Sequence, residues 1–186
     1  MRSSVTIWPG GRRALIAALF GLSFVLAPAP VRAQAEDALK SQFILNFARF
    51  TTWPSAAFAS PSAPLVVGFV GAPELADTFE KLATGKNING RELKVKKFDS
   101  ASSLDDSCHV VVAAPGAQSK AVAARIKGKH VLLVGQDAGF LEAGGIINLI
   151  VDGGRISFEI NLAPAHAASL ELDQKLRALA KSVKGA

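Results

Sequence analysis

The sequence predicts an α/β fold in a single domain, with a mixed and mostly parallel sheet, flanking helices and a C-terminal β-hairpin followed by a helix. Three observations predict this class. Short apolar runs alternate with segments of helical periodicity, which is typical of parallel strands joined by crossover helices. Two β-branched runs flank the turn residues 152–154, which is typical of a hairpin. The length of 186 residues suits one ordinary domain, which we expect at residues 36–184.

Residues 1–33 have the organisation of a secretory signal peptide. Arg12 and Arg13 precede a 13-residue apolar run, and small residues follow it. We expect cleavage after Ala33 or Ala35. A membrane anchor that stays in place is the alternative, but the apolar run is shorter than the roughly 20 residues that cross a bilayer.

Removal of this peptide changes the charge of the chain, because the peptide carries four arginines and no acidic residue. The number of basic residues falls from 21 to 17 against 15 acidic ones, so the net charge falls from +6 to +2. A nucleic-acid-binding protein needs a concentrated basic face. The mature charge therefore argues against nucleic acid as a partner.

The first segment of the expected domain has the pattern of an amphipathic helix with an aromatic stripe. Its large apolar side chains recur at spacings of four, four and three residues: Leu39, Phe43, Phe47 and Phe50. The helix should end near Trp53, because the residue before Pro54 is disfavoured in the α region. We expect the stripe to pack on the sheet. The alternative is a groove for a partner protein, with Phe50 and Trp53 as contacts, because aromatic residues dominate binding hot spots.

The middle of the chain alternates between buried strands and helices. Continuous apolar runs predict three strands, at residues 65–70, 110–114 and 131–134. One predicted helix begins at Pro73 and buries Leu75, Phe79 and Leu82, and a second covers residues 118–126. Strands that alternate with helices predict parallel pairing through right-handed crossovers.

A further strand is predicted at residues 91–98, directly after a turn at Asn89-Gly90. Three lysines lie along it: Lys94, Lys96 and Lys97. Lysines along a strand favour an edge position, where they prevent unwanted pairing with another sheet. An anion site is the alternative.

The predicted hairpin covers residues 144–161. In its second arm, apolar residues alternate with polar ones and should face the core: Ile156, Phe158 and Ile160. The opposite face should present polar groups. The first arm is almost continuously apolar, as in a strand that is covered on both sides.

After the hairpin we expect a helical turn at residues 163–168, an extended segment at 170–172 and a last helix. Asp173 suits the N-cap of that helix. Four apolar residues share one helical face and should be buried by it: Leu176, Leu179, Ala180 and Val183.

The residue pattern predicts no catalytic site and no metal or cofactor site. Cys108 and His109 are neighbours, but adjacent side chains of a strand point to opposite faces, so they should not form a nucleophile and base pair. His130 and His166 lack further ligands at metal-binding spacing. Cys108 is the single cysteine, so it forms no internal disulfide, and we expect it to be a buried small apolar residue.

Several motifs in their order and spacing resemble the YfiR family of exported bacterial proteins. They cover nearly the whole mature chain: residues 39–47, 50–54, 85–91, 144–149 and 155–162. The resemblance implies a periplasmic, non-enzymatic regulator. Such a regulator binds the periplasmic part of an inner-membrane diguanylate cyclase of YfiN type and represses it, which lowers cyclic di-GMP and restrains biofilm growth.

The family is also associated with small-molecule effectors, with homodimers and, in some members, with disulfides that tune the repressor. The single Cys108 departs from the last feature, because only an intermolecular disulfide could form. The polar residues of the second hairpin arm lie on a family motif and are candidates for ligand or partner contacts: Arg155, Glu159 and Asn161. The alternative is that these residues have structural roles, in an ion pair or as a cap of the next helix. The alternative function is a periplasmic small-ligand-binding module that serves another membrane sensor or a transporter.

Overall fold

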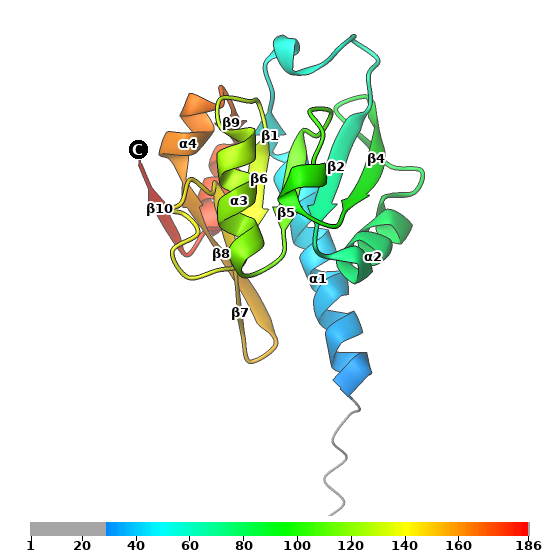
Figure 1. The fold of residues 1–186 in the computed structure, drawn as a ribbon, viewed down its shortest axis with the longest axis vertical. Coiled ribbons are helices and arrows are strands. Elements are labelled where there is room, and N and C mark those ends of the chain that lie inside the picture. Colours follow the sequence, from blue (N-terminus) through cyan, green and yellow to red (C-terminus); the bar gives the residue numbers. More distant parts are fainter. Residues whose placement is uncertain (1–28, 186) are drawn as a thin grey trace, which may run out of the picture.

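A mostly parallel β-sheet forms the middle layer of the fold (Figure 1). The computed structural model describes residues 29–185. Within them, eight strands build this sheet: β2 (Leu65–Val70), β3 (Asn87–Ile88), β4 (Arg91–Phe98), β5 (Val110–Ala113), β6 (Leu132–Gly135), β7 (Ile147–Asp152), β8 (Arg155–Asn161) and β10 (Ser182–Lys184). Their spatial order is β10-β8-β7-β6-β5-β2-β4-β3. The β3–β4 and β7–β8 pairs are antiparallel and the others are parallel, so the predicted mixed sheet is confirmed.

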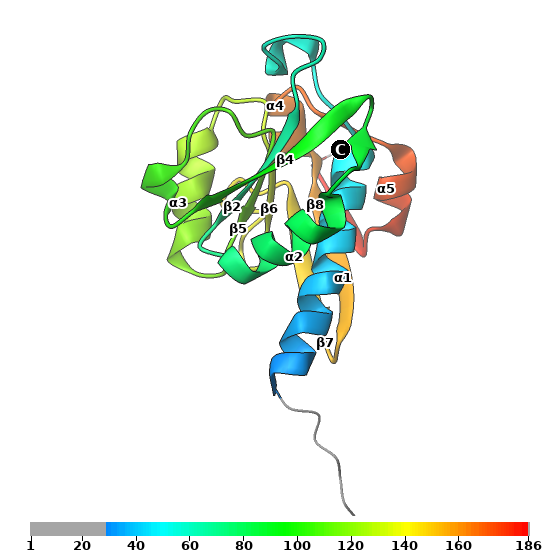
Figure 2. The same cartoon turned by 90° about the vertical axis from the view of Figure 1, so that its right-hand side faces the viewer.

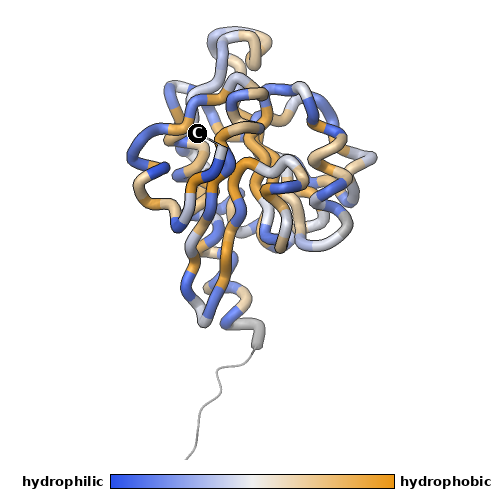
Figure 3. The backbone as a smooth tube through the Cα atoms, turned by 90° about the vertical axis from the view of Figure 1, so that its left-hand side faces the viewer, coloured by the Kyte–Doolittle hydropathy of each residue, from blue (hydrophilic) through white to orange (hydrophobic). Residues whose placement is uncertain are grey.

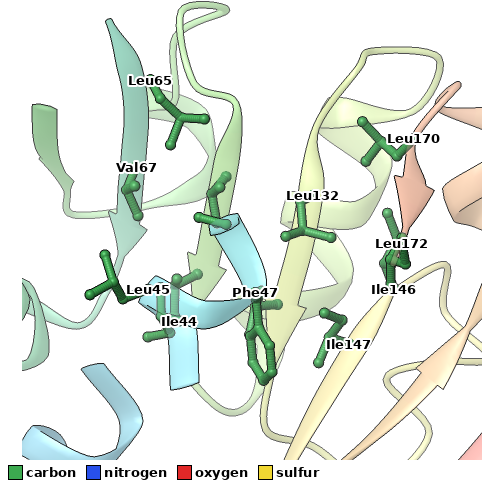
Figure 4. Close-up of a cluster of buried hydrophobic side chains, with 14 of the residues drawn as sticks. Ile44, Leu45, Phe47, Leu65, Val67, Leu132, Ile146, Ile147, Leu170 and Leu172 are labelled. Carbon is green, nitrogen blue, oxygen red and sulfur yellow. The ribbon is translucent and has the colours of Figure 1, made fainter. Parts of the chain in front are cut away.

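Helices cover both faces of the sheet (Figure 2). The helices are α1 (Ala29–Arg49), α2 (Pro73–Ala83), α3 (Ala117–Ile126), α4 (Leu162–Ala167) and α5 (Gln174–Leu179). α1 and α2 pack on one face, which we call the α1 face, and α3 packs on the other, the α3 face. A separate buried cluster fills each interface. On the α1 face, Ile44 and Phe47 lie against strand residues such as Leu132 (Figure 4). Figure 3 shows the most apolar residues concentrated in the strands.

The predicted aromatic helix is present as α1, but it ends at Arg49 and not near Trp53. The chain turns there because β1 (Thr51–Thr52) pairs with β9 (Glu171–Leu172), and the Thr51 hydroxyl donates to the carbonyl of Phe47 at 2.7 Å. Leu39 does not follow the predicted stripe into the core, since 46% of it is exposed. α1 also begins before the expected start of the domain, at Ala29. Most of the predicted signal peptide, residues 1–28, lies outside the described part of the chain.

The α2 helix begins at Pro73 as predicted, but its buried face is built from smaller residues than expected. Ala76 and Ala83 are buried beside Phe79, whereas Leu75 and Leu82 are half-buried at the margin of the core. Alanines at the contact allow α1 and α2 to approach closely over the sheet.

The lysine-bearing strand β4 lies near one edge of the sheet. Its first two residues pair with β3, and within residues 29–185 the rest of its outer side has no strand neighbour. Lys96 pairs with Asp105 at 2.6 Å, and Lys97 pairs with Asp77 and Glu80 of α2. These contacts favour the interpretation of the lysines as edge protection.

The predicted hairpin is present as β7 and β8, and it extends beyond the body of the domain (Figure 1). Gly153 and Gly154 have φ values of 55° and 81°, which suit the two central positions of a tight type I′ turn. The first arm is buried only at its base. Leu149 is buried, whereas Ile150 and Val151 are half-buried, because the tip extends past the helices.

The predicted last helix is wrong beyond Leu179. Asp173 caps α5 as predicted, since its carboxylate accepts from the Lys175 amide at 2.7 Å. The chain then becomes extended, and β10 pairs with β8 instead of continuing the helix. Leu176 is buried as predicted, but Leu179 is 73% exposed. The outer edge of β8 offers unpaired backbone groups, and strand pairing satisfies them whereas a longer helix would not.

Candidate functional site

The hairpin and the first half of α1 extend from the same end of the domain (Figures 1 and 2). The β7–β8 register places Val151, Ile156 and Phe158 on the α1 face. At the base of the hairpin, the ring of Phe158 lies 5.9 Å from that of Phe43 and 5.0 Å from that of Phe47. Closer to the tip, Val151 and Ile156 are only half-buried. The end of the domain therefore presents an accessible surface with apolar and polar residues.

The polar residues of the second arm lie on the α3 face, and the structure gives them different roles. Arg155 is exposed beside the turn, and no carboxylate pairs with it among the described residues. Glu159 accepts from the Ser182 hydroxyl of β10 at 3.0 Å. Asn161 caps α4: its side-chain oxygen accepts from the Ala163 amide, and its amide group donates to Leu141, each at 3.1 Å. Asn161 thus has the structural role that its position allowed.

The two aromatic candidates lie on the opposite side of the sheet. Phe50 is half-buried against the core of the α1 face. Trp53 is 9% exposed and its indole NH donates to the carbonyl of His109 at 3.2 Å. The sheet separates these residues from Arg155 and Glu159, so the five candidates do not form one continuous site. Their role in binding stays a prediction.

A polar and aromatic cluster that we did not predict lies next to Trp53. The guanidinium carbon of Arg91 lies 3.6 Å from the centre of the Phe58 ring, and Phe58 stacks on His109 at 4.4 Å. Arg91 also donates to the carbonyls of Ala63 at 2.6 Å and Ser60 at 3.1 Å. The cluster thereby holds the proline-rich loop over a hollow of about 480 Å³. The hollow is lined by Thr52, Trp53, Ser55, Phe58, Leu65, Ile88, Asn89 and Arg91.

His109 is buried and neutral in this cluster. Its Nδ1 accepts from the Val66 amide at 3.1 Å, so the proton lies on Nε2, which donates to the Ala57 carbonyl at 3.1 Å. Burial lowers the pKa of His109 below its usual value. Both ring nitrogens are occupied by backbone groups, so the residue holds the loop and is not placed to act as a base.

Cys108 lies on the other face of the same strand segment, as the alternation predicted. It belongs to the buried cluster of the α3 face, whereas His109 stacks on Phe58. Burial raises the pKa of the Cys108 thiol to about 12. A thiol with such a pKa carries almost no thiolate at neutral pH and is a poor nucleophile.

Six of the 15 acidic residues form surface ion pairs, among them Asp105 and Asp106. Lys96 and Ser107 donate to Asp105 and lower its pKa to about 2, and Lys129 lowers the pKa of Asp106. Across residues 29–185, no group of three or more His, Cys, Asp and Glu side chains is arranged to hold a metal ion. In the same part of the chain, no helix is both long and apolar enough to cross a membrane.

Comparisons with known proteins bear on the function. The profile of a protein family described as YfiR/HmsC-like matches residues 37–181. No curated protein matches the chain. A solved structure of a conserved domain protein from Vibrio cholerae O1 biovar El Tor str. N16961 is 16% identical, with a TM-score of 0.47. That match covers 64% of this chain and 54% of the other, so the chain spans about half the length of that protein.

Proposed function

Because the chain belongs to the YfiR/HmsC-like family, we propose that it is a periplasmic, non-enzymatic regulator that binds and represses an inner-membrane diguanylate cyclase. The family match over residues 37–181 is the observation that carries this proposal. The chemistry of three reactive side chains is consistent with it: both ring nitrogens of His109 bond to the backbone, the Cys108 thiol is buried, and Asp105 pairs with Lys96. Repression would lower cyclic di-GMP and restrain biofilm growth.

The partner contact that the geometry favours is the projecting end of the hairpin. Arg155 has an exposed guanidinium with no intramolecular carboxylate among the described residues, so it is free to pair with an acidic group of the cyclase. Glu159 lies further along the same face. Phe50 and Trp53 contribute to the core, so an effect of their truncation on binding must be separated from an effect on folding.

The decisive experiment measures cyclic di-GMP in cells. Deletion of the gene should raise the cyclic di-GMP level while the partner cyclase is expressed, and export of the restored protein should reverse the rise. Deletion in a strain without that cyclase should have no effect. An unchanged level in the first strain would exclude the repressor function.

A second experiment locates the contact. Arg155→Glu should weaken binding of the purified cyclase sensor domain about tenfold or more, which is roughly 1.4 kcal/mol. The thermal midpoint should fall only slightly, because Arg155 is exposed, although the new carboxylate lies opposite Asp152 in the hairpin. Arg177→Glu on α5 is the matched control, since Arg177 is also an exposed arginine. Equal affinities of the two variants for the sensor domain would show that Arg155 does not contribute to the contact.

Truncation of Trp53 tests the alternative anchor. Trp53→Ala should destabilise the domain by about 3 to 5 kcal/mol, because a large buried ring is removed. If the residue is also a binding anchor, affinity falls by about thirtyfold, roughly 2 kcal/mol, in the fraction that remains folded. Urea unfolding must therefore be measured beside binding.

The hollow beside Arg91 favours a second candidate function, a periplasmic small-ligand-binding module that serves another membrane sensor or a transporter. Aromatic walls and a guanidinium without a carboxylate partner in the described chain suit a small anionic ligand. Such a ligand, added from a fractionated periplasmic extract, should raise the thermal midpoint in a saturable way. Arg91→Gln should abolish that rise, and Lys94→Gln should preserve it.

A further inference from the structure

The C-terminal strand β10 is held to the sheet by few contacts. It pairs in parallel with β8 over three residues, from Ser182 opposite Glu159 to Lys184 opposite Asn161. The Lys181 amide donates to the carbonyl of Phe158 at 2.8 Å. At the side-chain level, Ser182 donates to Glu159 at 3.0 Å and Lys184 pairs with Glu142 at 3.1 Å. No side chain of β10 is buried, so hydrogen bonds and an exposed ion pair carry the attachment.

The sequence of this segment favours a different conformation. Leu176, Leu179, Ala180 and Val183 have the spacing of one helical face, yet the helix ends at Leu179. In the strand conformation Leu179 is 73% exposed and Val183 is 39% exposed. Local pattern and observed structure thus disagree here, which is a sign of an element with two accessible arrangements.

The edge that β10 covers is longer than β10 itself. β8 runs over seven residues, and β10 pairs with the last three of them, 159–161. Odd-numbered residues such as Asn161 direct their backbone groups to the β7 side, since the Asn161 amide donates to the Ile146 carbonyl. Even-numbered residues therefore direct theirs outwards. Ile156 lies on this outer edge, and within the described chain no strand pairs with it there.

Two acidic side chains beside the outer edge of β8 determine which charge a segment bound there can carry. Glu142 and Glu159 each accept from β10, and the pairing with Lys184 lowers the pKa of Glu142. A segment that replaces β10 meets these two carboxylates. Basic or hydroxyl side chains at the corresponding positions would satisfy them, and acidic ones would be repelled.

We propose that the outer edge of β8 is a strand-addition site for a basic, extended segment of a partner protein, and that residues 181–185 occupy this site until the partner displaces them. A longer strand pairs with the whole of β8 and makes more backbone hydrogen bonds than β10 does. The released segment is free to continue α5. This proposal does not depend on the identity of the membrane partner. It can therefore be tested separately from the proposed repression of a cyclase.

A peptide in the chain's own sequence tests the site directly. Residues 178–186, Ala-Leu-Ala-Lys-Ser-Val-Lys-Gly-Ala, are labelled and titrated into the purified mature protein and into a variant truncated after Ala180. The truncated variant should bind the peptide at least tenfold more tightly, because it lacks the residues that cover the outer edge of β8. The same peptide with Val183→Pro should not bind, since it lacks a strand amide. With Ser182→Glu and Lys184→Glu it should bind at least tenfold more weakly, because these positions meet Glu159 and Glu142.

A second measurement uses variants of the full mature chain. It tests the strand-addition site even if the truncated variant does not fold. The Lys184→Glu substitution places a second carboxylate beside Glu142 and should weaken the attachment of β10. This variant should therefore bind the peptide more tightly than the unmodified protein. Lys175→Glu on the exposed side of α5 should not. Amide exchange at Lys181 should also be much faster than at Asn161. Equal binding by the Lys184→Glu variant, the Lys175→Glu variant and the unmodified protein, or equally slow exchange at the two amides, would overturn the proposal.

Discussion

At the scale of single residues, His109 shows how a buried polar side chain can hold a loop. Its ring accepts from Val66 and donates to Ala57, while its face stacks on Phe58. Removal of the ring leaves buried backbone groups without partners, which destabilises a protein by about 1 to 3 kcal/mol. The arrangement requires the neutral imidazole, because the protonated ring has no lone pair for the Val66 amide.

This requirement predicts a pH dependence of stability. Because burial lowers the folded-state pKa of His109 below 6.5, the unfolded chain binds its proton first as the pH falls. The contribution of His109 is complete above pH 6.5 and is lost as the pH falls through the lowered folded-state pKa. Urea unfolding of the protein and of His109→Gln should therefore show a stability difference at pH 8 that narrows at pH 5. A difference that is the same at both pH values would contradict this account.

Cys108 should be chemically silent in the folded protein. The thiol is 5% exposed and burial raises its pKa to about 12, so little thiolate is available. A thiol reagent at pH 8 should label the native protein very slowly and the urea-unfolded protein at once. Cys108→Ser should leave the response of the signalling pathway to reductant unchanged. Loss of an oxidant response in that variant would indicate an intermolecular disulfide instead.

At the scale of elements, the hairpin depends on its turn. Gly154 has a φ of 81°, a region that side-chain-bearing residues adopt at a penalty of about 1 to 2 kcal/mol. Gly154→Ala should lower the free energy of unfolding by roughly that amount in urea titrations. Gly153→Asn is the matched control, because asparagine tolerates the 55° of that position and suits this turn type. Equal losses in both variants would mean that the turn geometry is not the cause.

The two ends of the described chain show where element patterns mislead. Leu39 continues the stripe of α1, but α1 extends past the sheet there and leaves it 46% exposed. Leu179 and Val183 continue the stripe of α5, but the edge of β8 draws the chain into a strand. In both places the periodicity is local, whereas burial depends on whether another element lies opposite.

At the scale of the whole molecule, the sheet divides the candidate surfaces. Phe50 and Trp53 belong to the α1 face, and Arg155 and Glu159 to the α3 face. A partner that contacts both sets would have to reach around the projecting end of the domain. The simpler arrangement uses the exposed hairpin end alone.

Export is a prediction about the whole chain that lies outside the described residues. Mass spectrometry of periplasmic material should find a mature protein that begins at Gln34 or Glu36, because signal peptidase cleaves after small residues such as Ala33 and Ala35. The net charge of the product beginning at Gln34 should be +2. Recovery of intact Met1 in the membrane fraction would contradict this prediction and favour a retained anchor.

Much of the architecture was predictable from residue patterns. The apolar runs of β2, β5 and β6, the Pro73 start of α2 and the glycine turn of the hairpin all appear where we expected them. For the candidate site, alternation placed Arg155 and Glu159 on one face correctly. The cluster of Arg91, Phe58 and His109 was not predictable, because these residues come from three separate segments and each pattern alone is ordinary.

The sequence by itself determined the α/β class, six of the eight strands of the main sheet, the hairpin turn and the family, because periodicity, turn chemistry and motif order are properties of neighbouring residues. The tertiary structure alone decided that Asn161 caps α4, that Trp53 donates to His109 and that the chain ends in β10 rather than in a longer helix. The physical reason is the same in each case. A buried or edge backbone group must find a hydrogen-bond partner, and which groups remain without one is known only after the sheet has assembled.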